Sequence, residues 1–268
     1  MIRWIILGVG ALVFVLLLFA DKTNLNSSDG LDIAAPTQQS RSALPPLAPD
    51  VATDALLARL DKAEGAERLG ILDSIIVSLQ ARNRTALAAD YAYEALSIDR
   101  SLVRLRQAGT LHYQATQLPY VAQDSILFRT YADRSITLLR DVTEQAPEDE
   151  DALINLGMAL TTSRLPQNSM QGILTIRKVL EMNPDNTAAS YQLGLFSMQT
   201  GQFDKAVSRF EKVLSLEPDN QVARYQLAQA YAQTNRAAEA RSLLETVLEQ
   251  AEDPELKRAA KNLLTEFN

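Results

Sequence analysis

Apolar and polar residues recur along most of this chain with the spacing of amphipathic helices. After about residue 51, apolar positions return every three or four residues, whereas runs of Val, Ile and Thr that alternate with polar residues are nearly absent. The pattern predicts helices over 53–63 and 253–267 and a series of helix pairs between them, with little sequence available for a sheet. We therefore expect an all-α fold.

The N-terminal segment has a different character. Residues 4–20, WIILGVGALVFVLLLFA, contain no charged side chain, and as a helix rising ~1.5 Å per residue they nearly cross a hydrocarbon core of about 30 Å. This run predicts a transmembrane anchor over 1–21. A cleavable signal peptide is the alternative, with LFA before Asp21 as its candidate cleavage site.

The charges beside this run predict its orientation. Arg3 precedes it and mainly acidic residues follow it, so we expect the N-terminus in the cytoplasm and the rest of the chain on the periplasmic, or extracytoplasmic, side of an inner (plasma) membrane. Residues 22–51 are rich in Ser, Pro, Ala and Gln, including APTQQSRS and LPPLAPD. Such a composition buries too little apolar surface to repay ordering, so this stretch is predicted to be a flexible linker.

The second half of the chain contains an internal repeat. YQLGLFSMQTG begins at Tyr191 and YQLAQAYAQTN begins 34 residues later at Tyr225, and the match continues through a second helix. A third copy contains LINLG at 153–157, whose Gly157 lies 37 residues before Gly194. We expect the three extra residues in the turn RLPQNSMQG, because lengthening a loop costs little.

A helix–turn–helix unit of 34 residues with this pattern resembles the tetratricopeptide repeat (TPR). The resemblance is strong over 150–250, although Ser190 and Ser197 stand where the family has large or aromatic residues. It implies a right-handed superhelical solenoid. In the copy that fits best, the family positions fall on Leu193, Gly194, Gly201, Phe203, Ala206, Phe210, Val213, Leu214 and Pro218.

The repeated small residues have a physical role. On the first helices they are expected to meet small residues of the second helices, which lets the two axes approach closely. The pairs would be Gly157 with Gly172, Gly194 with Ala206, and Ala228 with Ala240. The prolines at 147, 184 and 218 end the second helices, and the Asp-Asn pairs at 185–186 and 219–220 can cap the helices that follow.

Upstream of the three clear copies the pattern weakens. Residues 52–149 are predicted to form degenerate TPR-like repeats, 150–252 the three-repeat core and 253–268 a capping helix that covers the last apolar face. One upstream unit pairs Ala108 and Gly109 with Ser135 and Leu139, and it has about fourteen residues more than the family spacing. We expect these extra residues to form a long loop or to lengthen a helix.

Composition excludes several kinds of chemistry. The chain has no cysteine, a net charge of −7 and no cluster of Lys and Arg, so thiolate chemistry is excluded and nucleic acid is an unfavourable partner. His112 is the single histidine and no nucleophile motif accompanies it. The acidic run PEDEDA at 147–152 is typical of a helix start. We expect no enzyme activity, no cofactor, no metal and no small-molecule substrate.

What remains is the face that the first helices present. In the family this face lines a concave groove, and the resemblance carries that role to Asp151, Ile154 and Met198 in addition to the principal set. Tyr, Gln and Met are typical of protein interfaces, although the same side chains could pack between neighbouring first helices. The principal predicted groove residues are Asn155, Met158, Tyr191, Gln192, Leu195, Gln199, Tyr225, Gln226, Gln229 and Gln233.

The sequence thus predicts a non-catalytic scaffold or adaptor that binds a protein or peptide partner. Its layout is similar to that of bitopic bacterial TPR proteins of envelope protein assembly, including cytochrome c maturation. A self-associating structural scaffold is the alternative function.

Overall fold

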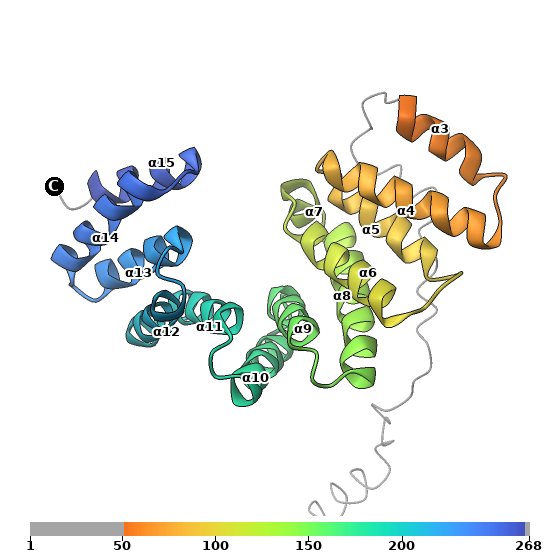
Figure 1. Cartoon of the computed structure of the whole chain (residues 1–268). Coiled ribbons are helices and arrows are strands. Elements are labelled where there is room, and N and C mark those ends of the chain that lie inside the picture. The colour runs from red at the N-terminus through yellow and green to blue at the C-terminus, as the bar shows by residue number, and fades with distance from the viewer. Residues whose placement is uncertain (1–50, 266–268) are drawn as a thin grey trace, which may run out of the picture. The chain divides into compact units, whose positions relative to one another are not determined.

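The computed structural model describes residues 51–265, and every regular element in that range is a helix (Figure 1). The all-α helix–turn–helix array expected from the sequence is confirmed there. None of these helices combines the length and the apolar character needed to cross a bilayer. The predicted anchor at 1–21 and nearly all of the predicted linker at 22–51 lie outside the described residues.

Consecutive helices pack against each other along the whole described range. Five hairpins dominate, formed by α4 with α5, α6 with α8, α9 with α10, α11 with α12, and α13 with α14. The helices are α3 (Val51–Leu60), α4 (Gly65–Ala81), α5 (Thr85–Ala95), α6 (Leu102–Thr116), α7 (Pro119–Gln123), α8 (Ser125–Gln145), α9 (Glu150–Thr162), α10 (Pro166–Met182), α11 (Thr187–Gln199), α12 (Phe203–Leu216), α13 (Gln221–Gln233), α14 (Ala237–Gln250) and α15 (Pro254–Thr265).

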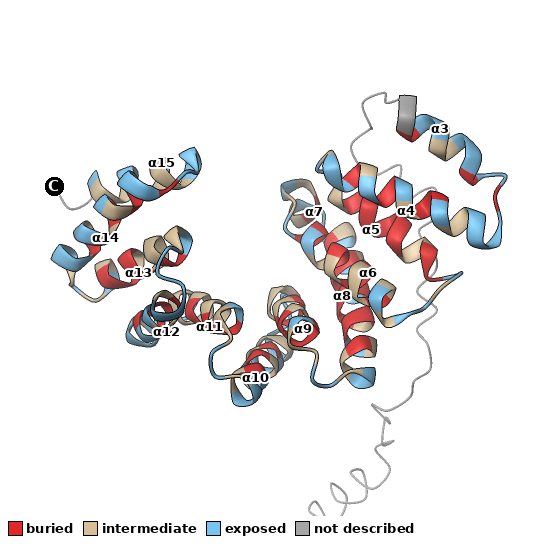
Figure 2. Cartoon of the chain, viewed as in Figure 1, coloured by how far each residue is buried: buried red, intermediate tan, exposed pale blue. Residues whose placement is uncertain are grey.

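The buried side chains lie on the helix faces that turn toward neighbouring helices, and the exposed ones lie on the opposite faces and in the turns (Figure 2). The largest apolar cluster joins α3 to α8, and a second joins α12 to α15. Ile75, Ile176, Phe210 and Leu244 are among the fully buried members. The three-to-four-residue spacing of apolar positions therefore produces one continuous series of helix-to-helix interfaces.

Close approach of the two helices of a hairpin depends on small residues. A Cβ on Gly172 would lie 2.5 Å from the carbonyl oxygen of Gly157, and a Cβ on Gly157 would lie 2.8 Å from that of Gly172. The predicted contact between these two glycines is confirmed. At Gly194 an added Cβ would first meet the Phe210 ring, at 2.6 Å, so there the missing side chain makes room for a large neighbour rather than for Ala206.

The turn inside four of the hairpins contains one residue in the left-handed backbone region. These residues are Asn83, Arg164, Gly201 and Asn235, with φ between 55° and 71°. Gly and Asn adopt this region at the least cost, which explains three of the four. The recurrence at 201 and 235 repeats the 34-residue period in the backbone itself.

The three extra residues of the 150–185 copy do not lie in the turn, as the sequence suggested. Arg164 and Gly201 hold the same left-handed place 37 residues apart, and each is followed two residues later by a helix. The insertion lengthens α10, which has 17 residues where α12 has 14. Pro166 at the first position of α10 favours this earlier start, because its fixed φ suits a helix N-terminus.

The longer insertion upstream combines a short helix with a lengthened one. α7 has 5 residues, and α8 then runs for 21 residues from an N-cap at Asp124, whose carboxylate accepts hydrogen bonds from the amides of Ile126 and Leu127. Deeper in this unit, Ser135 Oγ donates to the carbonyl oxygen of Gly109 at 2.9 Å. The predicted pairing of Ala108 and Gly109 with the second helix is thus present.

Asparagine and aspartate side chains start the first helices of the last three hairpins. Asp149, Asn186 and Asn220 each accept a hydrogen bond from the backbone amide three residues ahead. The predicted caps in the Asp-Asn pairs are confirmed, with Asn as the capping member. Asn186 also donates to Glu150 Oε2 at 2.6 Å, which ties the start of α11 to the start of α9.

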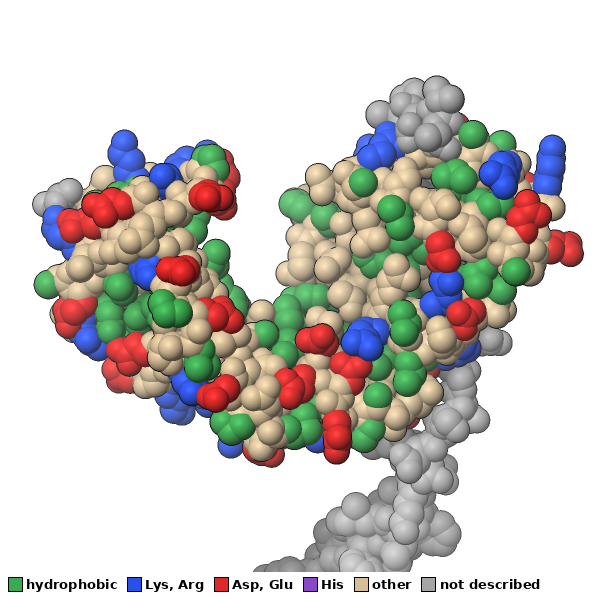
Figure 3. Space-filling view, viewed as in Figure 1, with side chains coloured by type: hydrophobic (Ala, Val, Ile, Leu, Met, Phe, Trp, Pro, Cys, Tyr) green, Lys and Arg blue, Asp and Glu red, His purple; other side chains and the backbone are tan. Residues whose placement is uncertain are grey.

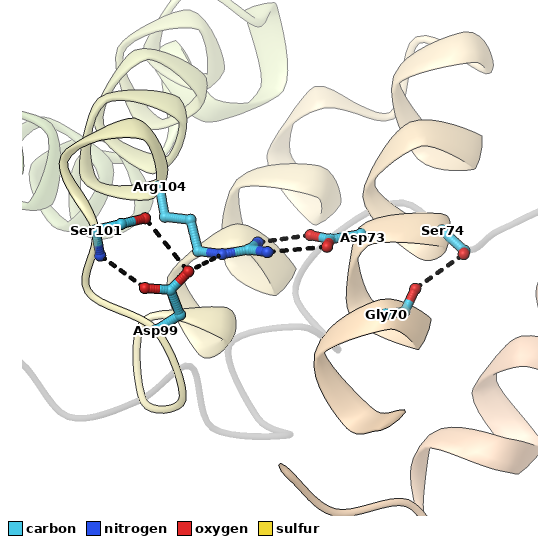
Figure 4. A network of polar contacts seen from close by, with 6 residues as sticks. All are labelled: Gly70, Asp73, Ser74, Asp99, Ser101 and Arg104. Atoms are coloured by element: carbon cyan, nitrogen blue, oxygen red, sulfur yellow. Dashed lines mark hydrogen bonds and ion pairs between the residues drawn. The ribbon is translucent and has the colours of Figure 1, made fainter. Parts of the chain in front are cut away.

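A polar network joins the first hairpin to the second (Figure 4). Arg104 on α6 donates two hydrogen bonds to the carboxylate of Asp73 on α4 and a third to Asp99, at 2.6 to 2.9 Å. The hydrogen bond from Arg104 and that from the Ser101 amide hold the pKa of Asp99 below its usual range. Bidentate geometry of this kind fixes orientation as well as distance.

A buried polar cluster lies between α5, α6 and α8. The His112 ring is fully buried beside the rings of Tyr93 and Tyr131, near the ion pair of Arg134 with Asp90. Its Nδ1 donates to the carbonyl oxygen of Ala108 at 2.8 Å, whereas its Nε2 has no hydrogen-bond partner. Burial, reinforced by the charge of Arg134 and opposed by the Ala108 bond, lowers the pKa of His112 to about 3. His112 is therefore a neutral structural residue at physiological pH.

Adding one methyl group at the closest helix contact should destabilise the array. Gly172→Ala forces apart two backbones that nearly touch, which should lower the free energy of unfolding by ~1–3 kcal/mol. Gly70→Ala is the matched control, since a Cβ there meets nothing within 4 Å and Ala should stabilise helix α4 by ~0.5–1 kcal/mol. Thermal unfolding of the two variants should therefore shift in opposite directions, and equal shifts would contradict the contact.

The buried neutral His112 predicts a loss of stability in mild acid. Its folded-state pKa lies below its unfolded value near 6.5, so its contribution is complete above pH 6.5 and is lost as the pH falls toward 3. Between pH 7 and pH 5 this amounts to about 2 kcal/mol. In His112→Leu the excess loss should disappear; Leu is apt because Leu160, three residues after Gly157, holds the corresponding buried place in α9. Parallel pH profiles of the two proteins would rule the assignment out.

Candidate functional site

The predicted groove residues lie on α9, α11 and α13, the first helices of the last three hairpins. Gln199 and Gln233 are exposed, and the other eight are partly buried. Of the additional family positions, Asp151 is exposed, Met198 is partly buried and Ile154 is buried. Ile154 therefore belongs to the core and cannot contact a partner without unfolding.

Tyr191 contributes to the packing of its own repeat. Its ring lies against the buried ring of Phe210 on α12, with the ring centroids 5.7 Å apart at an angle of 59°. Burial raises the pKa of the Tyr191 hydroxyl above its usual value. Leu195 packs against the same apolar cluster. The reading of these two side chains as packing between helices thus holds for part of their surface.

Tyr225 lies one repeat later and is also partly buried against that cluster. Gln229, one turn further along α13, donates from Nε2 to the Tyr225 hydroxyl at 3.2 Å. α11 and α13 contact each other directly. The structure therefore brings Tyr191, Gln192, Tyr225 and Gln226 onto two neighbouring helices, with half-buried side chains.

On α9 the predicted residues have internal partners. Asn155 donates from Nδ2 to the Thr110 hydroxyl of α6 at 3.3 Å, and Met158 packs against the apolar cluster between α9, α10 and α11. This end of the predicted strip connects hairpins to each other.

Two open hollows lie near these helices. Gln233 lines one of about 470 Å³ together with Gly201, Lys205 and Thr234, so one predicted residue borders a hollow. A larger groove of about 720 Å³ runs between α10 and α12 over the outer surface of α11, and we call it the α10–α12 groove. Its lining includes Met170, Ile173, Arg177, Phe196, Ser197 and Arg209.

The sequence analysis did not identify the α10–α12 groove. The signal was the departure at Ser197, where the family has an aromatic residue and where Tyr231 stands one repeat later. A small side chain at a position that is usually filled leaves space above the helix. Arg209, taken with its neighbours for part of a solvated outer face, is partly buried in the wall of this groove.

The acidic residues singled out in the sequence have structural partners. Asp149 caps α9 and also pairs with Arg106 at 3.2 Å, and Glu150 accepts hydrogen bonds from Asn183 and Asn186. Within residues 51–265, no three His, Asp or Glu side chains gather in a group that could hold a metal ion. On the face seen in Figure 3, acidic and basic side chains are interspersed, which does not favour a polyanion such as nucleic acid.

The arrangement defines a class of protein, an array of helical hairpins that offers side chains of its first helices as a surface. Residues 197–263 match the family described as tetratricopeptide repeat. No curated protein matches the chain. The chain is thus a TPR protein, with the family match on its last repeats. Repeats of this family mediate binding to proteins and peptides and are typically not catalytic.

Solved structures show the same fold. A thermophilic TPR protein of Thermus thermophilus, TTC0263, is 19% identical with a TM-score of 0.57, and the match covers 72% of this chain and 96% of that one. A MamA protein is 21% identical with a TM-score of 0.49, covering 69% of this chain and 92% of that one. YrrB, described as a TPR protein with an unusual peptide-binding site, is 17% identical with a TM-score of 0.47, covering 78% and 99%.

Proposed function

We propose that this protein is a non-catalytic adaptor that binds a protein or peptide partner on the face of its first helices. The observation that carries the proposal is the Tyr-Gln pair, which recurs on α11 and α13 in side chains that the packing only half buries. The fold uses Leu193 and Leu227 beside these pairs for its core. Their Tyr and Gln neighbours therefore retain surface for a partner.

The chemistry of this face suits a peptide. Tyrosine offers a rigid apolar ring with a polar tip, and glutamine supplies both a donor and an acceptor for a peptide backbone. The exposed Gln199 and Gln233 extend the strip toward the ends of their helices. We place the partner along this strip, in the concave groove of a right-handed superhelix of the kind that TPR arrays form.

We further propose that the array acts outside the cytoplasm, held to an inner membrane by residues 1–21 and separated from it by residues 22–51. Support comes from the uncharged run at 4–20 and from the charges on its two sides. The layout is similar to that of bitopic bacterial TPR proteins, so envelope protein assembly, such as cytochrome c maturation, is the role that we propose.

Site-specific crosslinking in cells tests the binding face. A photoreactive phenylalanine at Gln192 or Gln226 should capture a distinct partner. The same group at Glu245, exposed on α14, should not capture it, because that position lies on a second helix. Equal capture at all three positions would contradict the proposed face. Capture of only a second copy of the chain would favour the self-associating scaffold instead.

Reporter fusions test the topology. Alkaline phosphatase, which is active only outside the cytoplasm, should be active when fused after Val51, and the full chain should stay with membranes after an alkaline carbonate wash. Activity confined to a cytoplasmic reporter would reverse the orientation. Release by carbonate would indicate a cleaved signal in place of the anchor.

A further inference from the structure

The α10–α12 groove exists because one side chain is missing. In the following repeat, Tyr231 occupies the place of Ser197, is nearly buried, and donates from its hydroxyl to Glu211 at 2.6 Å. The guanidinium of Arg236 covers that ring at 3.8 Å. Ser197 has no ring, and its hydroxyl bonds back to the carbonyl oxygen of Leu193. The hollow that Tyr231 fills in its own repeat is thus left open beside Ser197.

The open hollow has apolar walls. Met170 on α10 is 62% exposed at its edge, and Phe196 and Ile173 are partly buried within it. Leu174, the next residue on α10, is 53% exposed. A flexible methionine beside an aromatic floor suits an aromatic or large aliphatic side chain, since the thioether adapts to the shape of its neighbour.

The charges at this groove are opposite to those of the filled position. Arg177 stands where the next repeat has Glu211, the acceptor for Tyr231, and Lys205 stands where it has Glu239. Arg209 lies on the opposite wall, on α12. Burial lowers the pKa of Arg209, and the like charge of Arg177 lowers it further. Two guanidinium groups that repel each other across a partly buried groove would be stabilised by a shared anion.

We propose that the α10–α12 groove binds an acidic peptide segment of a partner protein, with an aromatic side chain in the hollow beside Ser197 and carboxylates on Arg177 and Arg209. The occupant follows from the repeat itself, in which a tyrosine ring already fills the corresponding space. The reversed charge at position 177 changes the required companion from a basic to an acidic group. This site lies on the second helices, so it is independent of the face assigned to the Tyr-Gln pairs.

Binding of synthetic peptides to the full-length chain in detergent tests the site. The probe is a fluorescent peptide EEFEDE, compared by anisotropy with KKFKKK and with EEGEDE. The acidic aromatic peptide should bind, and each of the other two should bind at least roughly tenfold more weakly, because one reverses the charge and the other removes the anchor. Higher salt should weaken the binding. Failure of EEFEDE to bind at millimolar concentration, or equal binding of KKFKKK, would overturn the proposal.

Three variants locate the binding. Ser197→Tyr supplies the missing ring and Arg177→Glu copies the next repeat, so each should weaken the peptide at least roughly tenfold. Lys178→Glu makes the same change of charge on the neighbouring residue of α10, outside the groove lining, and should leave affinity within about twofold. Circular dichroism should show that each variant stays helical. An unchanged affinity of folded Ser197→Tyr would place the peptide elsewhere and refute the site.

Sedimentation of the same proteins excludes a different occupant. If a second copy of the chain filled the groove, the wild-type protein would self-associate and Ser197→Tyr would be monomeric. That result would overturn the acidic-peptide proposal. Because none of these measurements uses Gln192 or Gln226, a failure here leaves the crosslinking test of the first-helix face intact.

Discussion

The approach of two helix backbones across a small residue is the contact on which the rest of this array depends. At Gly157 and Gly172 the separation is so short that neither glycine can accept a methyl group without displacing the other helix. At Gly194 the same economy of space admits the Phe210 ring. Because each hairpin is closed in this way, its remaining apolar surface meets the next hairpin, and the array continues to the α15 helix.

This division of labour leaves parts of each helix unused by the fold. On α11 and α13, Leu193 and Leu227 are buried while the Tyr and Gln residues beside them are only half buried. On the other side of α11, the exchange of a ring for the small side chain of Ser197 opens a groove without disturbing the buried contacts of the hairpin. Interaction surfaces on an array of this kind arise where a position tolerates a residue that its neighbouring repeats do not have.

Much of the fold could be predicted from the sequence because its determinants are local and periodic. The 34-residue spacing located the hairpins, the small residues marked one backbone contact correctly, and Asn186 and Asn220 are the caps that the sequence suggested. The extra residues of the third copy were placed wrongly. A loop and a lengthened helix have the same sequence length, and the decision for α10 depends on the backbone at Arg164 and Pro166.

The candidate sites were harder to predict because they depend on contacts between residues far apart in the chain. Nothing in the spacing shows that Tyr191 leans on Phe210, that Asn155 bonds to Thr110, or that Arg177 and Arg209 share one groove. The difference between Ser197 and Tyr231 was visible in the sequence. Its consequence was not, since an empty space is defined by the elements around it.

Hydrogen exchange along the full-length chain tests the central claim most directly, because it reports which backbone amides are held by the hairpin contacts. If close helix packing at the small residues sustains the array, the slowest amides should lie around Gly157, Gly194 and Ala228 and on the buried faces opposite them. Slow exchange that spreads evenly over exposed and buried helix faces would weaken that claim. Exchange of α11 and α12 at the rate of an unstructured chain would contradict it.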